Sequence, residues 1–177
     1  MRLLCGIAFV FFLWMASLAT AQSASAPFAA LSFLLGTWEA KTVNNPAVTA
    51  NGTYTFRTEL KDHILARHTF TDSSKCKGPE DFNCEHGDLL YIYSETPGQP
   101  LRAIYLDNEG HVIHYTITVT SATSAEFLSD PAQPGPRFRL LYELKDGVMS
   151  GKFQIRMPGQ QEWRSYLEWA GARKQGT

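Results

Sequence analysis

Histidine and acidic side chains form two patterns in this sequence that could support ligand binding or proton transfer. His68 lies in an alternating apolar set between positions 63 and 71 and is the only ionisable member of that set. Such a histidine can orient a ligand, but it is also compatible with a core residue whose hydrogen bonds are satisfied. The segment DNEGH ends at His111, and its Glu109 and His111 could form an acid–base pair.

His111 and His114 also form an H-x-x-H pair, which on a helix would suggest a metal site. On a strand, residues three apart point to opposite faces. We therefore predict no metal at this pair and none elsewhere, and we expect no cofactor. The side of the sheet that His114 faces is left open, because its neighbours at alternate positions are Val112 and Thr116.

Two arginines near aromatic residues could bind an anion. Arg164 and Tyr166 are separated by one residue, and a guanidinium and a phenol can share the two oxygens of one carboxylate. Alternation conflicts with this reading, because Leu167 and Trp169 would then face water unless a β-bulge intervenes. Arg139 is a second polar candidate, in a strand with the same ambiguity.

The first 21 residues have the pattern of a secretory signal peptide. Arg2 is followed by a short apolar run and by the small residues Ala19-Thr20-Ala21. The run is shorter than the ~20 residues that span a bilayer. We predict cleavage after Ala21, with Ala26 as the alternative, and a mature bacterial domain at 22–177 that is periplasmic or secreted and has no stable membrane anchor.

The mature chain has the size and charge of one soluble domain. Its 156 residues fall within the range of about 100–200 for a single domain. The net charge is −1 for the whole sequence and −2 after cleavage, because Arg2 is the only charged residue removed. This near-neutral charge without basic clusters argues against nucleic acid as a partner, and also against electrostatic binding to membranes.

Cys76 and Cys84 frame a polar loop, CKGPEDFNC. An even number of cysteines in an exported chain predicts a disulfide that staples this loop. The alternative is a metal site that combines both cysteines with His86, although this spacing matches no strong zinc pattern.

The elements that must position these residues are mainly short strands. Only Pro27–Leu35 could form a short helix, with the proline at its start. From Gly36 onward, runs rich in Thr, Tyr, Phe, Val and Ile alternate with turn residues. The expected strands cover 36–43, 52–60, 63–71, 88–94, 101–106, 111–120, 124–129, 137–144, 148–156 and 162–170. Tight links, such as the two-residue turns expected in LKDH at Leu60 and LKDG at Leu144, make the strands sequential antiparallel neighbours.

We therefore predict an all-β fold, a single antiparallel meander β-barrel of about ten strands with a short amino-terminal capping helix. Closure removes the unpaired strand edges, and a two-sheet sandwich is the alternative. Alternation along the strands predicts which side chains face inward. The expected interior is aromatic and apolar, with few polar groups. The inward sets are Tyr54, Phe56; Ile64, Ala66, His68, Phe70; Ile113, Tyr115, Ile117, Val119; Phe138, Leu140, Tyr142, Leu144; Phe153, Ile155; and Trp163, Leu167, Trp169.

The stretch FLLGTWEA, from Phe33 to Ala40, marks the start of the barrel. Gly36 permits the sharp exit from the helix, and Trp38 would plug one end with a large ring. Gly36-Thr37-Trp38 resembles the G-x-W motif of lipocalins and the similar start of fatty-acid-binding proteins. The order of elements likewise resembles the calycin superfamily, in particular bacterial lipocalin-like domains, as do the segments from Ala103 to Tyr115 and from Gly135 to Leu144.

The resemblance implies a small hydrophobic ligand inside the barrel. It implies that an arginine near the carboxyl terminus, Arg164 or Arg173, lies across Trp38, and that Arg164 and Tyr166 match the R-x-Y pair with which fatty-acid-binding proteins hold a carboxylate. The count of ten strands also resembles nitrobindin-type haem barrels. That resemblance would imply a proximal histidine late in the chain, but no histidine follows His114. The candidate ligand-binding residues are Trp38, Tyr54, His68, His114, Tyr115, Arg139, Arg164 and Tyr166.

The leading hypothesis is an exported lipocalin-like barrel, monomeric or weakly dimeric, that binds a small hydrophobic ligand. Whether it is an enzyme is left open, with a non-enzyme favoured. One alternative is an isomerase or hydrolase of a lipophilic substrate at the barrel mouth, which would use Glu109, His111 and His114. The other is an envelope protein with a packed interior that binds another protein.

Overall fold

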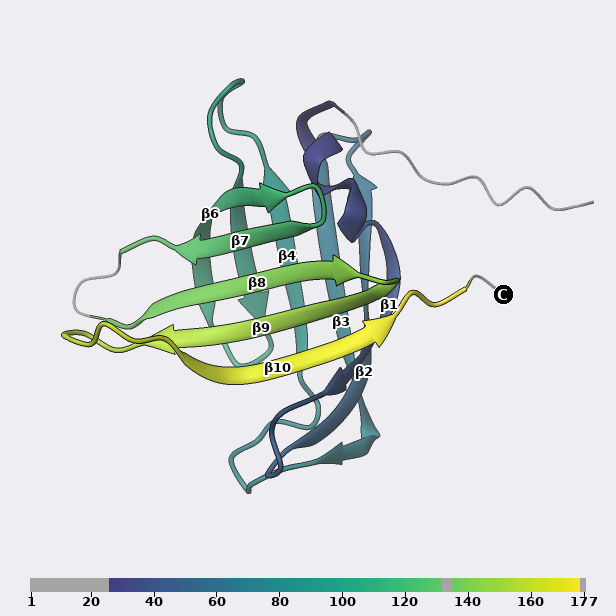
Figure 1. Ribbon diagram of the computed structural model, residues 1–177, viewed down its shortest axis with the longest axis vertical. Coiled ribbons are helices and arrows are strands. Elements are labelled where there is room, and N and C mark those ends of the chain that lie inside the picture. The colour runs from purple at the N-terminus through teal and green to yellow at the C-terminus, as the bar shows by residue number, and fades with distance from the viewer. Residues whose placement is uncertain (1–25, 132–134, 176–177) are drawn as a thin grey trace, which may run out of the picture.

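The computed structural model describes residues 26–131 and 135–175, which fold into a closed antiparallel barrel (Figure 1). A 3₁₀ helix, η1 (Ala26–Leu34), precedes the strands. The strands are β1 (Gly36–Thr42), β2 (Thr49–Glu59), β3 (Ile64–Lys77), β4 (Gly87–Tyr93), β5 (Arg102–Asp107), β6 (Val112–Ser121), β7 (Ser124–Ser129), β8 (Arg137–Lys145), β9 (Val148–Arg156) and β10 (Arg164–Ala172). The predicted fold class is confirmed, whereas the predicted signal peptide lies outside the described residues.

All ten predicted strands are present, and most of their ends lie within two residues of the expected positions. The largest difference is at β3, which continues to Lys77 and pairs there with the start of β2. The capping helix is also confirmed, although it is a 3₁₀ helix over Ala26–Leu34. No helix in the described ranges combines the length and hydropathy that a bilayer crossing requires.

Each strand pairs with its neighbour in the chain, and β1 closes the ring against β10. This seam is short, since its ladder pairs Lys41 with Ala170 and Thr42 with Trp169. An isolated bridge between Trp38 and Arg173 extends it toward η1. The two backbones approach so closely that a Cβ atom added at Gly171 would overlap the carbonyl of Glu39.

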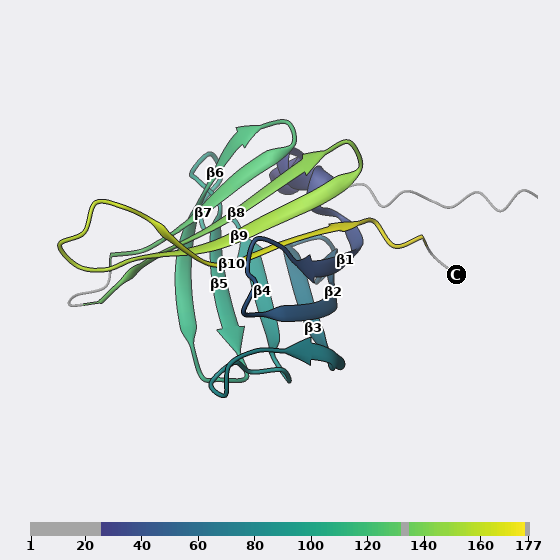
Figure 2. The same ribbon diagram turned by 60° about the horizontal axis from the view of Figure 1, so that its bottom comes forward.

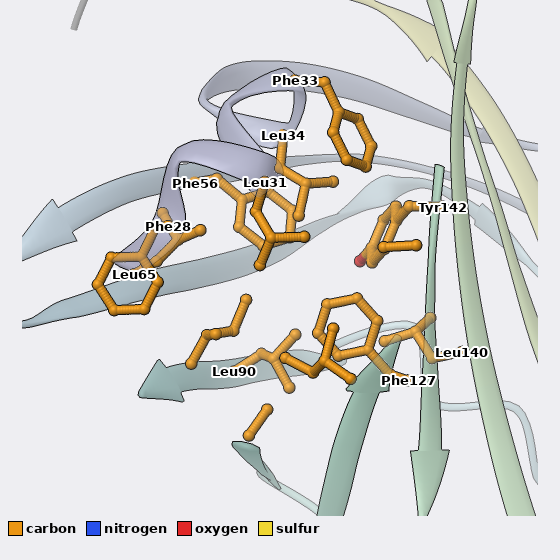
Figure 3. Close-up of a cluster of buried hydrophobic side chains, with 14 of the residues drawn as sticks. Phe28, Leu31, Phe33, Leu34, Phe56, Leu65, Leu90, Phe127, Leu140 and Tyr142 are labelled. Atoms are coloured by element: carbon orange, nitrogen blue, oxygen red, sulfur yellow. The ribbon is translucent and has the colours of Figure 1, made fainter. Parts of the chain in front are cut away.

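Helix η1 closes one end of the barrel. Its apolar side chains point onto residues from several strands, including Phe56, Leu65, Leu90 and Phe127 (Figure 3). Trp38 is 1% exposed, and its indole N–H donates to the carbonyl of Leu34 at 2.7 Å. This end of the barrel is therefore filled with side chains, as predicted from the stretch around Trp38.

Gly36 has a φ of +108°, a conformation that favours glycine. The guanidinium of Arg173 lies in the space that a side chain at Gly36 would need. From there Arg173 donates to the carbonyl of Leu35, and its Cζ atom lies 4.3 Å from the Trp38 ring centroid. Of the two arginines expected for this role, Arg173 performs it and Arg164 does not.

The opposite end carries the connections between β1 and β2 and between β3 and β4, which come forward in Figure 2. A disulfide joins Cys76, near the end of β3, to Cys84 in the β3–β4 connection, as predicted. The bond excludes the alternative metal site, and the His86 side chain makes hydrogen bonds to carboxylates instead. A disulfide is consistent with an oxidising compartment.

The predicted inward set is correct for most strands but wrong for β3. Leu65 is fully buried in the core, and Arg67 and Thr69 line the interior. Phe70, which was expected inside, is 68% exposed at the rim of the cavity, and the His68 side chain is 39% exposed. Trp163 was also expected inside, but it lies outside the barrel between two arginine side chains.

Candidate functional site: a cavity around Arg67

The half of the barrel away from η1 contains a cavity of about 610 Å³. Its apolar lining includes Ile113, Leu140, Phe153 and Trp169. Contrary to the prediction of few polar groups, the lining also contains a buried arginine, several carboxylates and tyrosines. The cavity is therefore suited to a ligand with both apolar and polar parts.

Arg67 is the centre of this polar lining. Its side chain is 5% exposed and forms an ion pair with Asp88, whose side chain is 6% exposed. The other Nη atom of Arg67 donates to the hydroxyl of Tyr142. Burial alone would lower the pKa of Arg67, but Asp88 and Tyr142 outweigh it and raise the pKa, so the guanidinium stays charged.

Asp88 also stays ionised, because its charged neighbours outweigh the effect of burial on its pKa. Burial alone would raise the pKa of its carboxyl group, but the charge of Arg67 and hydrogen bonds from His86 and Arg67 lower the pKa. The interior therefore holds both charged members of an ion pair, Arg67 and Asp88. A purely apolar ligand would make no polar contact with this pair. This arrangement favours a ligand that presents a polar group to the pair.

Four tyrosines surround the guanidinium. Tyr142 accepts its hydrogen bond, and the ring centroid of Tyr105 lies 6.0 Å from the Cζ atom of Arg67. Tyr54 and Tyr115 lie close enough for the charge of Arg67 to act on their hydroxyl groups. Burial raises the pKa of all four hydroxyls, so they remain protonated and able to donate hydrogen bonds.

Several buried polar atoms of this lining lack a hydrogen-bond partner. Among the residues that the structure describes, these atoms are the hydroxyls of Thr69 and Tyr115 and the Nε atom of Arg67. All three residues line the cavity. Buried groups of this kind are nearly always satisfied in folded proteins, by protein, water or ligand. Their common location points to a missing partner inside the cavity.

A second polar group lies nearer the surface, where His86 links two carboxylates. Its Nε2 atom is 3.2 Å from Asp88 Oδ2, and its Nδ1 atom is 2.9 Å from Glu109 Oε1. Hydrogen bonds to Asp88 and Glu109 raise the pKa of His86 despite its partial burial. Because Glu109 belongs to the β5–β6 turn, the imidazolium connects that turn to β4 at the rim of the cavity.

We predict that His86 stabilises the fold most at low pH. A histidine with a raised folded-state pKa contributes fully below its unfolded value near 6.5 and loses this contribution as the pH rises through the folded-state pKa. An NMR titration should give His86 a pKa above 6.5, and Glu109→Gln should lower it. Glu85→Gln, an exposed neighbouring carboxylate, is the control and should leave the pKa of His86 unchanged; equal shifts in both variants would contradict the contact.

Three of the residues proposed from the sequence lie around the cavity. Tyr54 and Tyr115 belong to the polar lining, and Tyr166 lies at the rim, with 58% of its surface exposed. The β9–β10 ladder shifts register between Ser165 and Leu167, which places Tyr166 in a β-bulge. Strict alternation would not let Tyr166 and Leu167 face the same side, and the bulge resolves this conflict. This bulge allows Tyr166, Leu167 and Trp169 all to line the cavity.

The other candidates lie elsewhere. Trp38 fills the closed end, and Arg164 is exposed at the start of β10 without lining the cavity. His68 faces outward, where its Nε2 atom is 3.0 Å from Glu59 Oε1. His114 is exposed on β6 between the inward residues Ile113 and Tyr115. Arg139 bonds Gln154 on the outer surface.

Glu109 and His111, which the sequence suggested as an alternative acid–base pair, bond different residues. Glu109 bonds His86, whereas the Nδ1 atom of His111 lies 2.9 Å from Asp107 Oδ2. Both residues are at the rim of the cavity, but the structure does not combine them with His114 into one group.

The sequence did not identify Arg67, Asp88 and Tyr105, and it indicated His86 only as a ligand of the alternative metal site. A usable signal was present in the LKDH turn, where His63 N–H donates to the carbonyl of Leu60. This turn places Phe56 opposite Arg67 and Tyr54 opposite Thr69. Directly paired residues lie on the same face of a sheet, so an inward Tyr54 already implies an inward Thr69 and Arg67.

No protein-family model and no curated protein matches this chain. The closed ten-stranded antiparallel barrel is compatible with a calycin-like fold.

Proposed function

We propose that this protein is a binding protein for a small amphipathic molecule, held inside a calycin-like barrel. The apolar body of the ligand would contact the side chains around Phe153 and Trp169. Its polar end would accept hydrogen bonds from Arg67 and the neighbouring tyrosines. The observation that carries the proposal is the group of unpartnered donors at one side of a cavity of about 610 Å³.

The size and chemistry of the cavity support this proposal. Sites for small ligands usually have volumes of about 300–1,000 Å³ and a few polar groups within an apolar lining. The donors that lack partners include an arginine N–H, which can only donate. A ligand oxygen, such as one from a carboxylate or a carbonyl group, complements them better than an amine would.

The proposed binding takes place after export. The signal-peptide pattern at 1–21 and the Cys76–Cys84 disulfide support a periplasmic or secreted location. The alternative of a protein-binding domain with a packed interior is disfavoured by the cavity itself.

Decanoate and decylammonium provide a direct test, because they share an apolar chain and differ in the polar end. We expect decanoate to change the tryptophan fluorescence saturably, because Trp169 lines the cavity, and decylammonium to bind at least tenfold more weakly. Mass spectrometry of small molecules that remain bound through purification should reveal an amphipathic compound. The absence of any saturable response and of any retained molecule would overturn the proposal.

Tyr115→Phe separates the binding role of the hydroxyl from its effect on stability. Because the hydroxyl is buried without a partner, its removal should raise the free energy of unfolding of the ligand-free protein by about 1 kcal/mol. The same change should weaken decanoate binding roughly fivefold, which corresponds to the loss of one hydrogen bond. Denaturant melts and fluorescence titrations measure the two effects.

Tyr142→Phe is the matched control. Its hydroxyl accepts a hydrogen bond from the Arg67 guanidinium, so its loss should lower the free energy of unfolding by about 1.5–3 kcal/mol. If Tyr115→Phe destabilised the ligand-free protein as much as Tyr142→Phe does, the Tyr115 hydroxyl would have a partner in the protein and the argument from missing partners would be wrong.

A further inference from the structure

The outer surface of β8 and β9 carries a cluster of three arginines, which is separate from the cavity. Arg137 on β8 is paired directly with Arg156 on β9, and Arg139 lies two residues further along β8. Like charges at directly opposed positions destabilise a sheet. In the described part of the chain, the only carboxylate that forms an ion pair with any of these three arginines is Glu126, 3.7 Å from Arg139.

The three arginines differ in how many of their N–H groups have a hydrogen-bond acceptor in the described part of the protein. Arg139 donates twice to Gln154 Oε1, at 2.9 and 2.7 Å. Arg137 donates from Nη2 to the carbonyl of Ser129, but its buried Nε has no acceptor among the described residues. Arg156 forms neither a hydrogen bond nor an ion pair with any described residue. Two guanidinium groups therefore have N–H groups available for a ligand.

Trp163 fixes the position of two of these guanidinium groups. The Cζ atoms of Arg139 and Arg156 lie 4.6 and 4.8 Å from its ring centroid. The contact of Arg156 with the ring uses none of its N–H groups as hydrogen-bond donors, so these N–H groups can bind a planar or tetrahedral anion. Glu162, next in sequence to Trp163, takes part in no ion pair within the described ranges and so does not neutralise this group.

A small pocket of about 240 Å³ lies between the arginines and the connection of β9 to β10. Arg137 and Arg156 line it together with Gly135, Gln160 and Gln161. The connection projects from the barrel wall in both Figure 1 and Figure 2. The pocket thus combines two cationic side chains with amide groups, on a part of the molecule that is accessible to a partner.

We propose that Arg137, Arg156 and the adjoining turn form a binding site for a phosphate-type oxyanion. Such an anion can accept several N–H groups at once, including the buried Nε of Arg137. It would also neutralise the two opposed positive charges, which the described side chains leave uncompensated. The anion could be free phosphate or the phosphate of a lipid headgroup, since both present the same oxygens.

Titration with inorganic phosphate tests the site, with the Nε–H resonances of Arg137 and Arg156 followed by NMR. We expect saturable shifts of both resonances in the wild-type protein. Arg137→Gln and Arg156→Gln should each weaken phosphate binding about tenfold, in line with the loss of a charge-assisted hydrogen bond. Lys145→Gln, which removes one charge from the exposed end of β8, is the control and should change affinity less than twofold.

Vesicles distinguish the source of the anion. Binding to vesicles of phosphatidylcholine and phosphatidylglycerol in equal parts, but not to phosphatidylcholine alone, would assign a lipid headgroup if the two arginine variants abolish it. Should Arg156→Gln fail to fold, Arg156→Lys keeps the charge while losing the planar fork, and it should still weaken binding. The proposal is overturned if neither phosphate nor vesicles bind saturably, or if Lys145→Gln weakens binding as much as the arginine variants.

Discussion

Replacing Asp88 with alanine is expected to lower the free energy of unfolding by about 3–5 kcal/mol, the usual cost of removing one partner of a buried ion pair. The substitution leaves the Arg67 guanidinium charged in an interior where its side chain is 5% exposed. It also removes one of the two carboxylates that bond His86. Urea denaturation of the wild-type protein and the variant measures the difference.

A double variant shows whether the cost arises from the unpaired charge. Arg67→Met combined with Asp88→Leu removes both charges and should be more stable than Asp88→Ala alone. It should also lose the preference for decanoate over decylammonium, because the arginine donor is gone. Asp72→Ala is the surface control; Asp72 pairs with Lys75 at 2.9 Å on an exposed segment and should have little effect. Equal losses for Asp88→Ala and Asp72→Ala would refute the buried-pair argument.

Trp38→Ala should also destabilise the barrel, by about 3–5 kcal/mol, because it empties the closed end of a large buried ring. The variant additionally loses the indole hydrogen bond to Leu34 and the contact with Arg173. Thermal and denaturant melts followed by far-ultraviolet circular dichroism provide the measurement.

Phe70→Ala is the matched control for Trp38→Ala, since it also removes an aromatic ring from a strand. Phe70 is 68% exposed, so its loss should change the free energy of unfolding by less than about 1 kcal/mol. A loss below about 1 kcal/mol for Trp38→Ala would mean that the ring does not support the closed end.

The strands and the closed end were predictable because their signals are local. Turn residues divide the chain into short apolar runs, and the pair Gly36 and Trp38 marks the exit from the helix. The resemblance gave two candidates, Arg164 and Arg173, for the arginine that lies across the Trp38 ring. The register of β10 against β1 places Arg173 beside Trp38. The disulfide was likewise indicated by two cysteines in one short loop.

The polar centre of the cavity was not predicted, because hydropathy alone was used to orient β3. The set with Ile64, Ala66 and Phe70 is more apolar than the set with Arg67 and Thr69, yet the second set faces inward. Register, rather than hydropathy, decides the face of a strand beside a tight turn. An arginine can lie inside because Asp88, on the next strand, neutralises it.

The short seam between β1 and β10 affects how the protein is made. Its two strands are the first and the last of the barrel, so the ring cannot close until synthesis has delivered Arg173. Until then, β1 has a free edge that can pair with any other extended chain. A carboxy-terminal truncation before β10 would therefore leave an open sheet with two unprotected edges, prone to aggregation.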